Sequence, residues 1–164
     1  MPISGVAIIA GIYNAYVCMR DKKTQGTNGG TFTAGDWRTR DLTEELADTA
    51  NIASLSSNAI TLAAGTYCCF ISCPAWKVTG NQARLYDNTH STMLLAGTPE
   101  MAYNEANGYS RSIIVGRFTL TSTSELLIQH QGQVTCAIYG FGCPMNWTDE
   151  IYTVAEFWRR QANA

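Results

Sequence analysis

The sequence predicts an all-β protein, an antiparallel sandwich or jelly roll. From residue 52 onward, short apolar segments recur at intervals of roughly 8–12 residues and are separated by turns rich in Gly, Pro and Asn. The last segment, Glu150–Trp158, carries β-branched or aromatic side chains on both faces when it is read at a period of two. With 164 residues the chain suffices for one domain with a sizeable core. We expect this domain over residues 13–164, preceded by an apolar arm over residues 1–12.

The individual elements follow from composition and periodicity. Residues 20–30 are charged and then glycine-rich, as is typical of a loop. Thr43, followed by acidic residues, predicts a short helical turn over residues 43–46. Pro74 is expected to end the strand before it. The strands are expected over residues 13–19, two short segments of 31–42 around Gly35, 52–56, 60–62, 66–73, 82–86, 93–95, 109–120, 125–131, 134–139 and 150–158.

The composition restricts the kinds of partner. Only 15% of the residues are charged, against about 25% in average domains, and the remaining polar residues are mainly Thr, Ser, Asn, Gln and Gly. Such a surface suits a protein that is packed in an assembly. The net charge of −2 gives no electrostatic reason to expect nucleic acid. No apolar run approaches the roughly 18–20 residues of a membrane helix, so we expect no membrane insertion.

The cysteines and histidines do not form a recognisable metal motif. No pair of cysteines has the CxxC spacing, and both histidines lie far from all of them, so we predict no metal and no cofactor. Two interpretations of the cysteines remain open. They are reduced, buried side chains of a protein assembled in a reducing cytoplasm, or Cys136 pairs with Cys143 across the glycine-rich turn between them. The six cysteines are Cys18, Cys68, Cys69, Cys73, Cys136 and Cys143.

No arrangement of residues indicates catalysis. His130 is the best candidate base, but on a strand it shares a face with Ile128 and Gly132, which favours a histidine of the core or of an interface. The sequence has no GxSxG, HExxH or paired-carboxylate motif, and its scattered aspartates form no calcium loop. We therefore expect no catalytic residues and no enzymatic activity.

Both faces of the final strand are expected to be buried against other parts of the protein. Ile151, Thr153, Ala155 and Phe157 are expected on one face, and the other face carries Tyr152, Val154, Glu156 and Trp158. One face meets the core of its own domain. The other is covered by a neighbouring subunit, or by loops of the same chain. The subunit interpretation predicts an interface made of Tyr152, Val154, Glu156 and Trp158.

Glu156 is the exception in this apolar row. An unpaired buried carboxylate is costly, so Glu156 is expected either to have a cationic partner or to lie at a wet rim of the interface. Three arginines on predicted strands are candidates for that partner, and Arg117 is the first choice. The other two are Arg84 and Arg111.

Six segments, in this order, resemble one known family. The chain is similar over about residues 13–160 to the C1q/TNF-like jelly-roll domains of bacteriophage virion proteins, of the tail-fibre or capsid-associated type. The resemblance implies a ten-stranded antiparallel sandwich that assembles as a homotrimer, with the last strand in the inner sheet near the threefold axis. It implies adhesion or assembly and carries over no catalytic residue. The segments are Trp37–Arg40, Ile60–Tyr67, Gln82–Tyr86, Ile114–Phe118, Leu126–His130 and Ile151–Trp158.

Two functions follow from this resemblance. The first is a virion structural protein: a trimeric knob, assembled in the host cytoplasm, whose arm anchors it to other capsid or tail proteins through Val6, Ile8, Ile9 and Ile12. The second is the adhesin tip of a tail fibre that binds a host surface polysaccharide. Aromatic residues in or beside loops would make that contact, although aromatics also commonly cap a sandwich core. They are Trp76, Tyr103, Tyr109 and Trp147.

Overall fold

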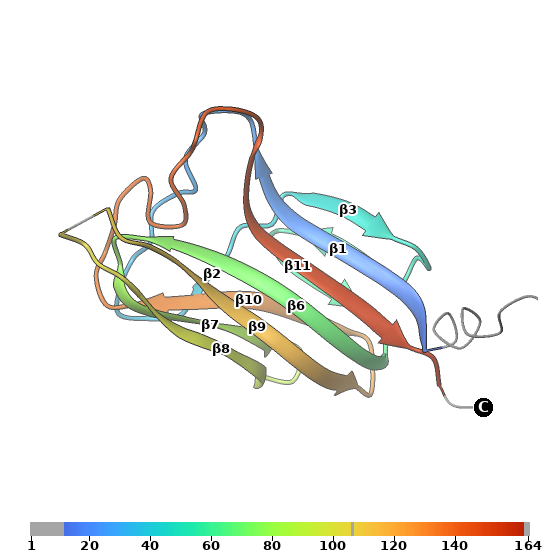
Figure 1. Cartoon of the computed structure of the whole chain (residues 1–164). Helices are drawn as coiled ribbons and strands as arrows, with labels where there is room; N and C mark the ends of the chain where they lie inside the picture. The colour runs from blue at the N-terminus through green and yellow to red at the C-terminus, as the bar shows by residue number, and fades with distance from the viewer. Residues whose placement is uncertain (1–11, 106, 163–164) are drawn as a thin grey trace, which may run out of the picture.

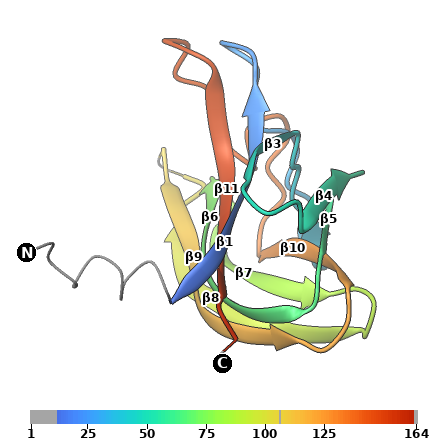
Figure 2. The same ribbon diagram turned by 90° about the vertical axis from the view of Figure 1, so that its right-hand side faces the viewer.

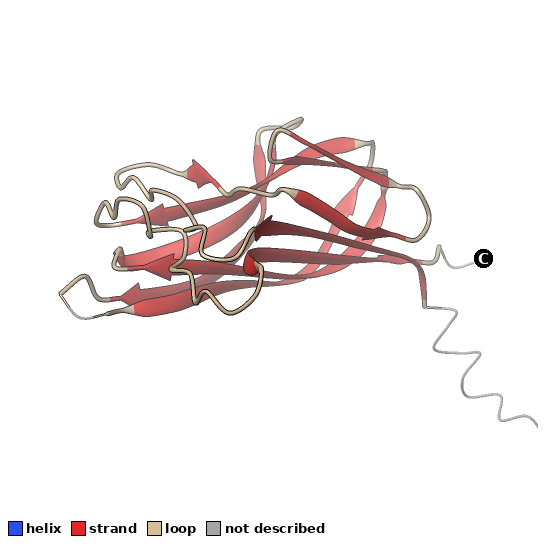
Figure 3. Ribbon diagram, turned by 90° about the horizontal axis from the view of Figure 1, so that it is seen from above, coloured by secondary structure: helices blue, strands red, loops and turns tan. Residues whose placement is uncertain are grey.

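A computed structural model describes residues 12–105 and 107–162, and these residues form β-strands and loops without a helix (Figure 3). No segment of this part of the chain is therefore a helix that could span a membrane. The strands are β1 Tyr13–Lys23, β2 Arg38–Thr39, β3 Glu44–Asp48, β4 Ala53–Ser56, β5 Ala59–Leu62, β6 Gly65–Trp76, β7 Thr79–Asp87, β8 Thr92–Ala102, β9 Tyr109–Leu120, β10 Ser124–Gly132 and β11 Glu150–Arg160.

The strands form two antiparallel sheets packed face to face (Figures 1 and 2). The five-stranded sheet has the order β3-β1-β11-β6-β9, so the last strand lies at its centre. The six-stranded sheet has the order β4-β5-β10-β7-β8, and the short β2 pairs with β10 beside this path. This arrangement confirms the predicted jelly-roll sandwich.

The core fills the space between the two sheets. Along each strand, buried apolar residues alternate with more exposed ones, as a sandwich requires. Cys69 is buried while its neighbour Cys68 faces outward, and all six cysteines are free thiols. His130 is fully buried in the six-stranded sheet, as expected for a core histidine. The largest core side chains are Met19, Ile60, Leu62, Tyr67, Ile71, Leu85, Ile114, Leu126, Ile128 and Phe157.

Two long loops lie together at one end of the sandwich. Gly29 N–H donates to Gly142 O at 2.9 Å, and Phe32 and Cys136 exchange two backbone hydrogen bonds. The side chain of Arg40, only 1% exposed, ties these loops to the sheets. Its guanidinium donates to the Thr153 hydroxyl, the Pro74 carbonyl and the Phe141 carbonyl, each at 2.9 Å.

The start of β1 and the end of β11 lie at the opposite end. Gln161 N–H donates to Ile12 O at 2.8 Å, which extends the β1–β11 pairing beyond both strands. Ile12 is 41% exposed there. Val6, Ile8 and Ile9, the other predicted anchoring residues, lie outside the described part of the chain.

Two predicted elements are wrong. Residues 43–46 do not form a helical turn, because Glu44 and Glu45 pair with β1 in strand β3, and Arg20 contacts the Glu44 carboxylate. This tertiary pairing overrides a weak local preference. Residues 134–139 do not form a strand: they belong to the loop pair described above, and Ile138 has a φ of 68°.

Two predicted boundaries also shift. β6 continues through Pro74 to Trp76, and β9 remains its partner over this part. The pairing of β6 with β11 already ends at Ser72, so the N–H group that proline lacks is not needed for a hydrogen bond to β11. Of the two strands expected within residues 31–42, only Arg38–Thr39 forms one, and Phe32 makes an isolated bridge.

Candidate functional site: the outward face of the five-stranded sheet

We call the side of the five-stranded sheet that points away from the other sheet the outward face. Its side chains follow from the register. Trp158 lies between Tyr16 and Cys68 on the flanking strands, and Phe70 lies between Glu156 and Val115. Directly opposed residues share a face, so these rows cross the sheet from β1 to β9. The central residues of the outward face are Tyr16, Cys18, Cys68, Phe70, Ile113, Val115, Val154, Glu156 and Trp158.

This face is largely apolar and only partly covered by its own protomer. Phe70 is 40% exposed and Val115 is 63% exposed, although the two residues pair with each other in the middle of the long strands β6 and β9. Val154, Ile113 and Trp158 beside them are half-buried. A contiguous apolar area on a sheet, as opposed to a single exposed apolar residue, marks a surface that contacts another molecule.

Glu156 has a partner within the protomer, and it is a tyrosine. The Tyr16 hydroxyl donates to Glu156 Oε1 at 2.6 Å, and the Tyr16 ring lies against Trp158 with the centroids 5.6 Å apart. Burial first and the hydrogen bond to Glu156 second raise the pKa of Tyr16, so the hydroxyl stays a donor. Arg117 lies one row away, opposite Cys68, and forms no ion pair with Glu156 within the described protomer. Contact between Arg117 of one protomer and Glu156 of another stays a prediction.

Tyr152 differs from the prediction for the interface. It is only 3% exposed, because the loops at the end of the sandwich cover it. Its hydroxyl donates to Thr27 O at 2.7 Å, and its ring lies against Gly142. Tyr152 therefore holds a loop of its own protomer, and Val154, Glu156 and Trp158 are the members of the predicted set that reach the outward face.

Phe70, Ile113 and Val115 were missed by the interpretation of the sequence. The signal was present, because the segments Cys68–Cys73 and Ile113–Val115 are apolar on both faces, like the last strand. The same reasoning that singled out Glu150–Trp158 would have placed all three central strands at a covered face.

The predicted ligand-contact aromatics are partly brought together. Trp76 and Tyr109 are paired residues of β6 and β9, with ring centroids 6.2 Å apart, and they line a cavity of about 350 Å³ with Arg111 and Met145. Tyr103 and Trp147 do not line this cavity, and the Trp147 side chain is 83% exposed.

The described residues do not form a metal site. No three His, Cys, Asp or Glu side chains come together in residues 12–105 and 107–162. His130 Nε2 donates to Asn81 Oδ1 at 3.0 Å, and burial lowers the pKa of His130 well below its ordinary value, so the ring is neutral and closed off from solvent. The outward face, with its exposed Phe70 and Val115, is the candidate functional site.

Comparisons with known proteins place the fold. The sequence matches no protein-family model and no curated protein at a significant level. The structure is similar to murine APRIL at pH 5.0, with a TM-score of 0.59 and 10% identity over 88% of this chain and 98% of that one. It is also similar to the globular domain of zebrafish complement 1qA, with a TM-score of 0.55 and 13% identity over 92% and 99%. At these identities the likeness concerns architecture: the chain has the C1q/TNF-like jelly-roll fold.

Proposed function

We propose that this protein is a non-enzymatic structural component that assembles as a homotrimer through the outward face. The observation that carries the proposal is the exposure of Phe70 and Val115 at the centre of an apolar sheet face. Burying such a face contributes about 25 cal/mol for each Å² removed from water, so three copies gain by meeting along it. The central position of β11 in that sheet agrees with the trimer that the sequence resemblance implies.

The setting that we propose is a bacteriophage virion, with the trimer as a knob fixed to capsid or tail. It is supported by the resemblance of the six segments, by the charge-poor composition and by the apolar residues 1–12. Labelling intact particles with an antibody to this chain tests the setting. Removing residues 1–12 is expected to abolish incorporation while leaving the free trimer intact. A truncated chain that still incorporates would contradict the anchoring role.

The mass in solution tests the assembly directly. Sedimentation at micromolar concentration is expected to give three times the 17.9 kDa mass of the chain. Phe70→Asp and Val115→Asp each place a charge in the proposed interface and should yield folded monomer. Met93→Asp is the matched control, because Met93 is 52% exposed on the other sheet, and it should leave the trimer intact. A monomeric wild-type protein would refute the proposal.

The second candidate function is an adhesin that binds host surface polysaccharide. The cavity between Trp76 and Tyr109 favours it, because paired aromatic rings at a loop end suit contact with sugars or proteins. Loss of cell binding by the Trp76→Ala trimer would support this function.

A further inference from the structure

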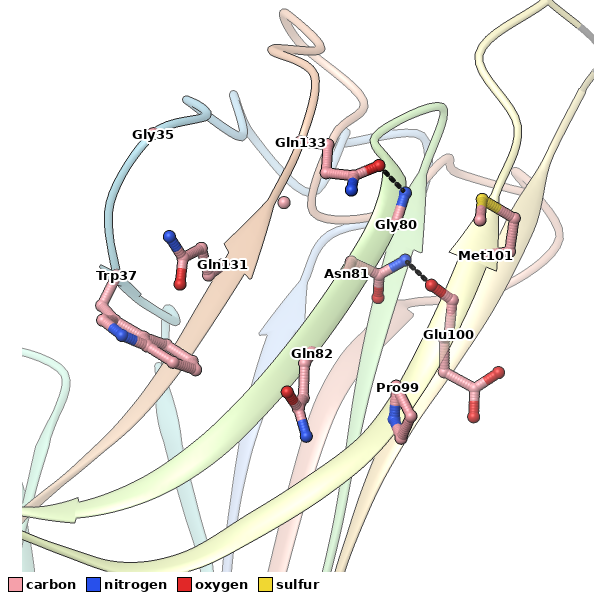
Figure 4. A pocket seen from close by; sticks show the side chains of 11 residues that line it. Gly35, Trp37, Gly80, Asn81, Gln82, Pro99, Glu100, Met101, Gln131 and Gln133 are labelled. Carbon is pink, nitrogen blue, oxygen red and sulfur yellow. Dashed lines mark hydrogen bonds between the residues drawn. The ribbon is translucent and has the colours of Figure 1, made fainter.

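The six-stranded sheet carries a groove on the side that faces away from the core (Figure 4). Its volume is about 710 Å³, within the roughly 300–1,000 Å³ of typical ligand sites. β10, β7 and β8 form its floor, and the loop before β2 forms one wall. The side chains that determine its chemistry are Trp37, Gln82, Pro99, Glu100, Met101, Gln131 and Gln133.

The register places these side chains in two rows. Gln131 pairs with Gln82, and Gln82 pairs with Pro99. Arg38 pairs with His130, so Trp37, the residue before Arg38, lies beside Gln131 at the end of this row (Figure 4). In the second row, Gly80 pairs with Met101 and accepts a backbone hydrogen bond from Gln133 N–H at 3.0 Å.

Trp37 is held in place from one side. The Arg84 guanidinium lies 4.0 Å from the centroid of the Trp37 ring, and Arg84 Nε donates to Gln129 Oε1 at 2.8 Å. A rigid, half-buried indole at the end of a polar row provides a flat apolar surface. Met101 and Pro99 provide a second apolar surface on the far side of the groove.

The glutamine side chains between these two surfaces have hydrogen-bond donors and acceptors that are not used within the protein. Gln82 Nε2 donates to Gly97 O at 2.8 Å, which leaves its carbonyl oxygen free. Gln133 Oε1 accepts from Gly80 N–H at 3.1 Å, which leaves its N–H groups free. The Gln131 amide makes no hydrogen bond with the described residues. The groove therefore offers donors and acceptors side by side, which is what a ligand rich in hydroxyl groups requires.

The lack of positive charge in the groove argues against an anionic ligand. Glu100 is the one charged residue among those that line it, so no Lys or Arg is present there to bind phosphate, sulfate or carboxylate. An extended peptide would add to a free strand edge, which next to this groove is the outer side of β8, whereas the floor of the groove consists of the paired strands β10, β7 and β8. From the uncharged amides and the two apolar surfaces we infer that the groove binds a neutral oligosaccharide.

This site lies on the opposite side of the sandwich from the outward face. If the chain assembles as proposed above, the three grooves stay open and point away from the trimer. A polymer with repeated units then engages several grooves at once, which raises its apparent affinity without any new contact.

The test is binding of the full-length protein to an array that holds neutral hexose and N-acetylhexosamine oligosaccharides beside sialylated and sulfated ones. Neutral chains are expected to bind. Trp37→Ala and Gln131→Ala are each expected to weaken that binding by roughly three- to tenfold. Trp147→Ala is the matched control, because Trp147 is exposed outside the groove, and it should have no effect.

Three results would overturn the inference: no binding of neutral chains, a preference for the anionic chains, or loss of binding in Trp147→Ala but not in Trp37→Ala. Gly80→Ala provides an independent variant. A Cβ at Gly80 would lie 2.8 Å from Gln133 Oε1, so it displaces that flexible amide while the fold is retained, and binding should again weaken. Measuring the mass of the same samples separates the two proposals, because a trimer that binds no sugar refutes only the groove and a monomer that binds refutes only the assembly.

Discussion

The Tyr16 hydroxyl and Glu156 Oε1 are joined by a 2.6 Å hydrogen bond that crosses diagonally from β1 to β11 on the outward face. It gives the one carboxylate at the centre of an apolar surface a neutral partner instead of a cation. The two side chains are supplied by opposite ends of the chain, 140 residues apart. The bond therefore ties the first strand of the domain to the last.

Tyr16→Phe removes this donor without changing the shape of the ring. Because Glu156 then lacks its partner on a partly buried face, we expect a loss of about 1–2 kcal/mol in the free energy of unfolding, measured with denaturant. Glu156→Gln retains an acceptor oxygen and should cost less. If Tyr16→Phe and the wild type unfold at the same denaturant concentration, the hydrogen bond does not stabilise the fold. Arg117→Met, which leaves the Tyr16–Glu156 pair intact, tests the separate prediction of an ion pair between protomers.

Arg40→Met should be among the most damaging changes in the core. It leaves the Thr153 hydroxyl and the carbonyls of Pro74 and Phe141 without their donor in a buried site, for an expected cost of about 3 kcal/mol. Arg38→Met is the control, since Arg38 bonds only the loop carbonyls of Thr33 and Ala34 at a more exposed position. Equal denaturation midpoints for the two variants would show that the Arg40 contacts are not needed.

His130 should make stability depend on pH below its ordinary pKa of 6.5. Burial, and secondarily the charge of Arg40, lower the pKa of His130 in the folded state, so the unfolded chain takes up a proton first as the pH falls. The stabilisation is complete above pH 6.5 and decreases below it, by at most about 1.4 kcal/mol per pH unit for this group. His130→Gln keeps an N–H donor for Asn81 and should flatten this dependence between pH 6.5 and 5. An unchanged slope in that variant would contradict the assignment.

Gly142→Ala tests how closely the loop lies against β11. Gly142 has a φ of +147°, and a Cβ there would lie 2.1 Å from Cδ1 of Tyr152. Gly35→Ala also adds a side chain at a positive φ, but nothing lies within 4 Å of the new atom. We expect Gly35→Ala to cost about 1 kcal/mol from backbone strain and Gly142→Ala to cost about 1–3 kcal/mol more from overpacking. Similar melting temperatures would mean that the loop moves aside freely.

The strands of the two sheets could be predicted from the sequence because strand periodicity depends only on residues that are close together in the chain. The alternation in Gln82–Tyr86 and Glu125–Gln131, and the apolar last strand, identify elements whose buried faces the structure confirms. The helical turn at residues 43–46 was wrong because pairing of Glu45 with Met19 decides the conformation of that segment, and this pairing depends on the whole sheet.

The contacts within the candidate site could not be predicted as well from the sequence. The sequence indicates Arg117 as a partner for Glu156 because it is a cation on a predicted strand, whereas the observed partner within the protomer, Tyr16, is set by the β1–β11 register. Tyr152 belongs to the apolar row of the last strand by periodicity, but the loop that covers it has no regular pattern. The groove was missed because Trp37, Gln82 and Gln131 come from three separate segments that only the sheet order brings together.

The hydrogen bond between Gln161 N–H and Ile12 O makes this fold a good subject for circular permutation. In a chain without residues 1–11 and 162–164, a linker of a few residues would join Gln161 to Ile12, and new ends could be opened in the exposed Asn88–Ser91 turn between β7 and β8. In such a permutant β1 would follow β11 directly along the backbone, so that their pairing would be a local hairpin and would no longer depend on closure of almost the whole polypeptide. The β7–β8 pairing would in turn become the one that joins the two ends of the polypeptide, so the permutant exchanges one long-range pairing for another and should refold at a rate similar to that of the natural connectivity.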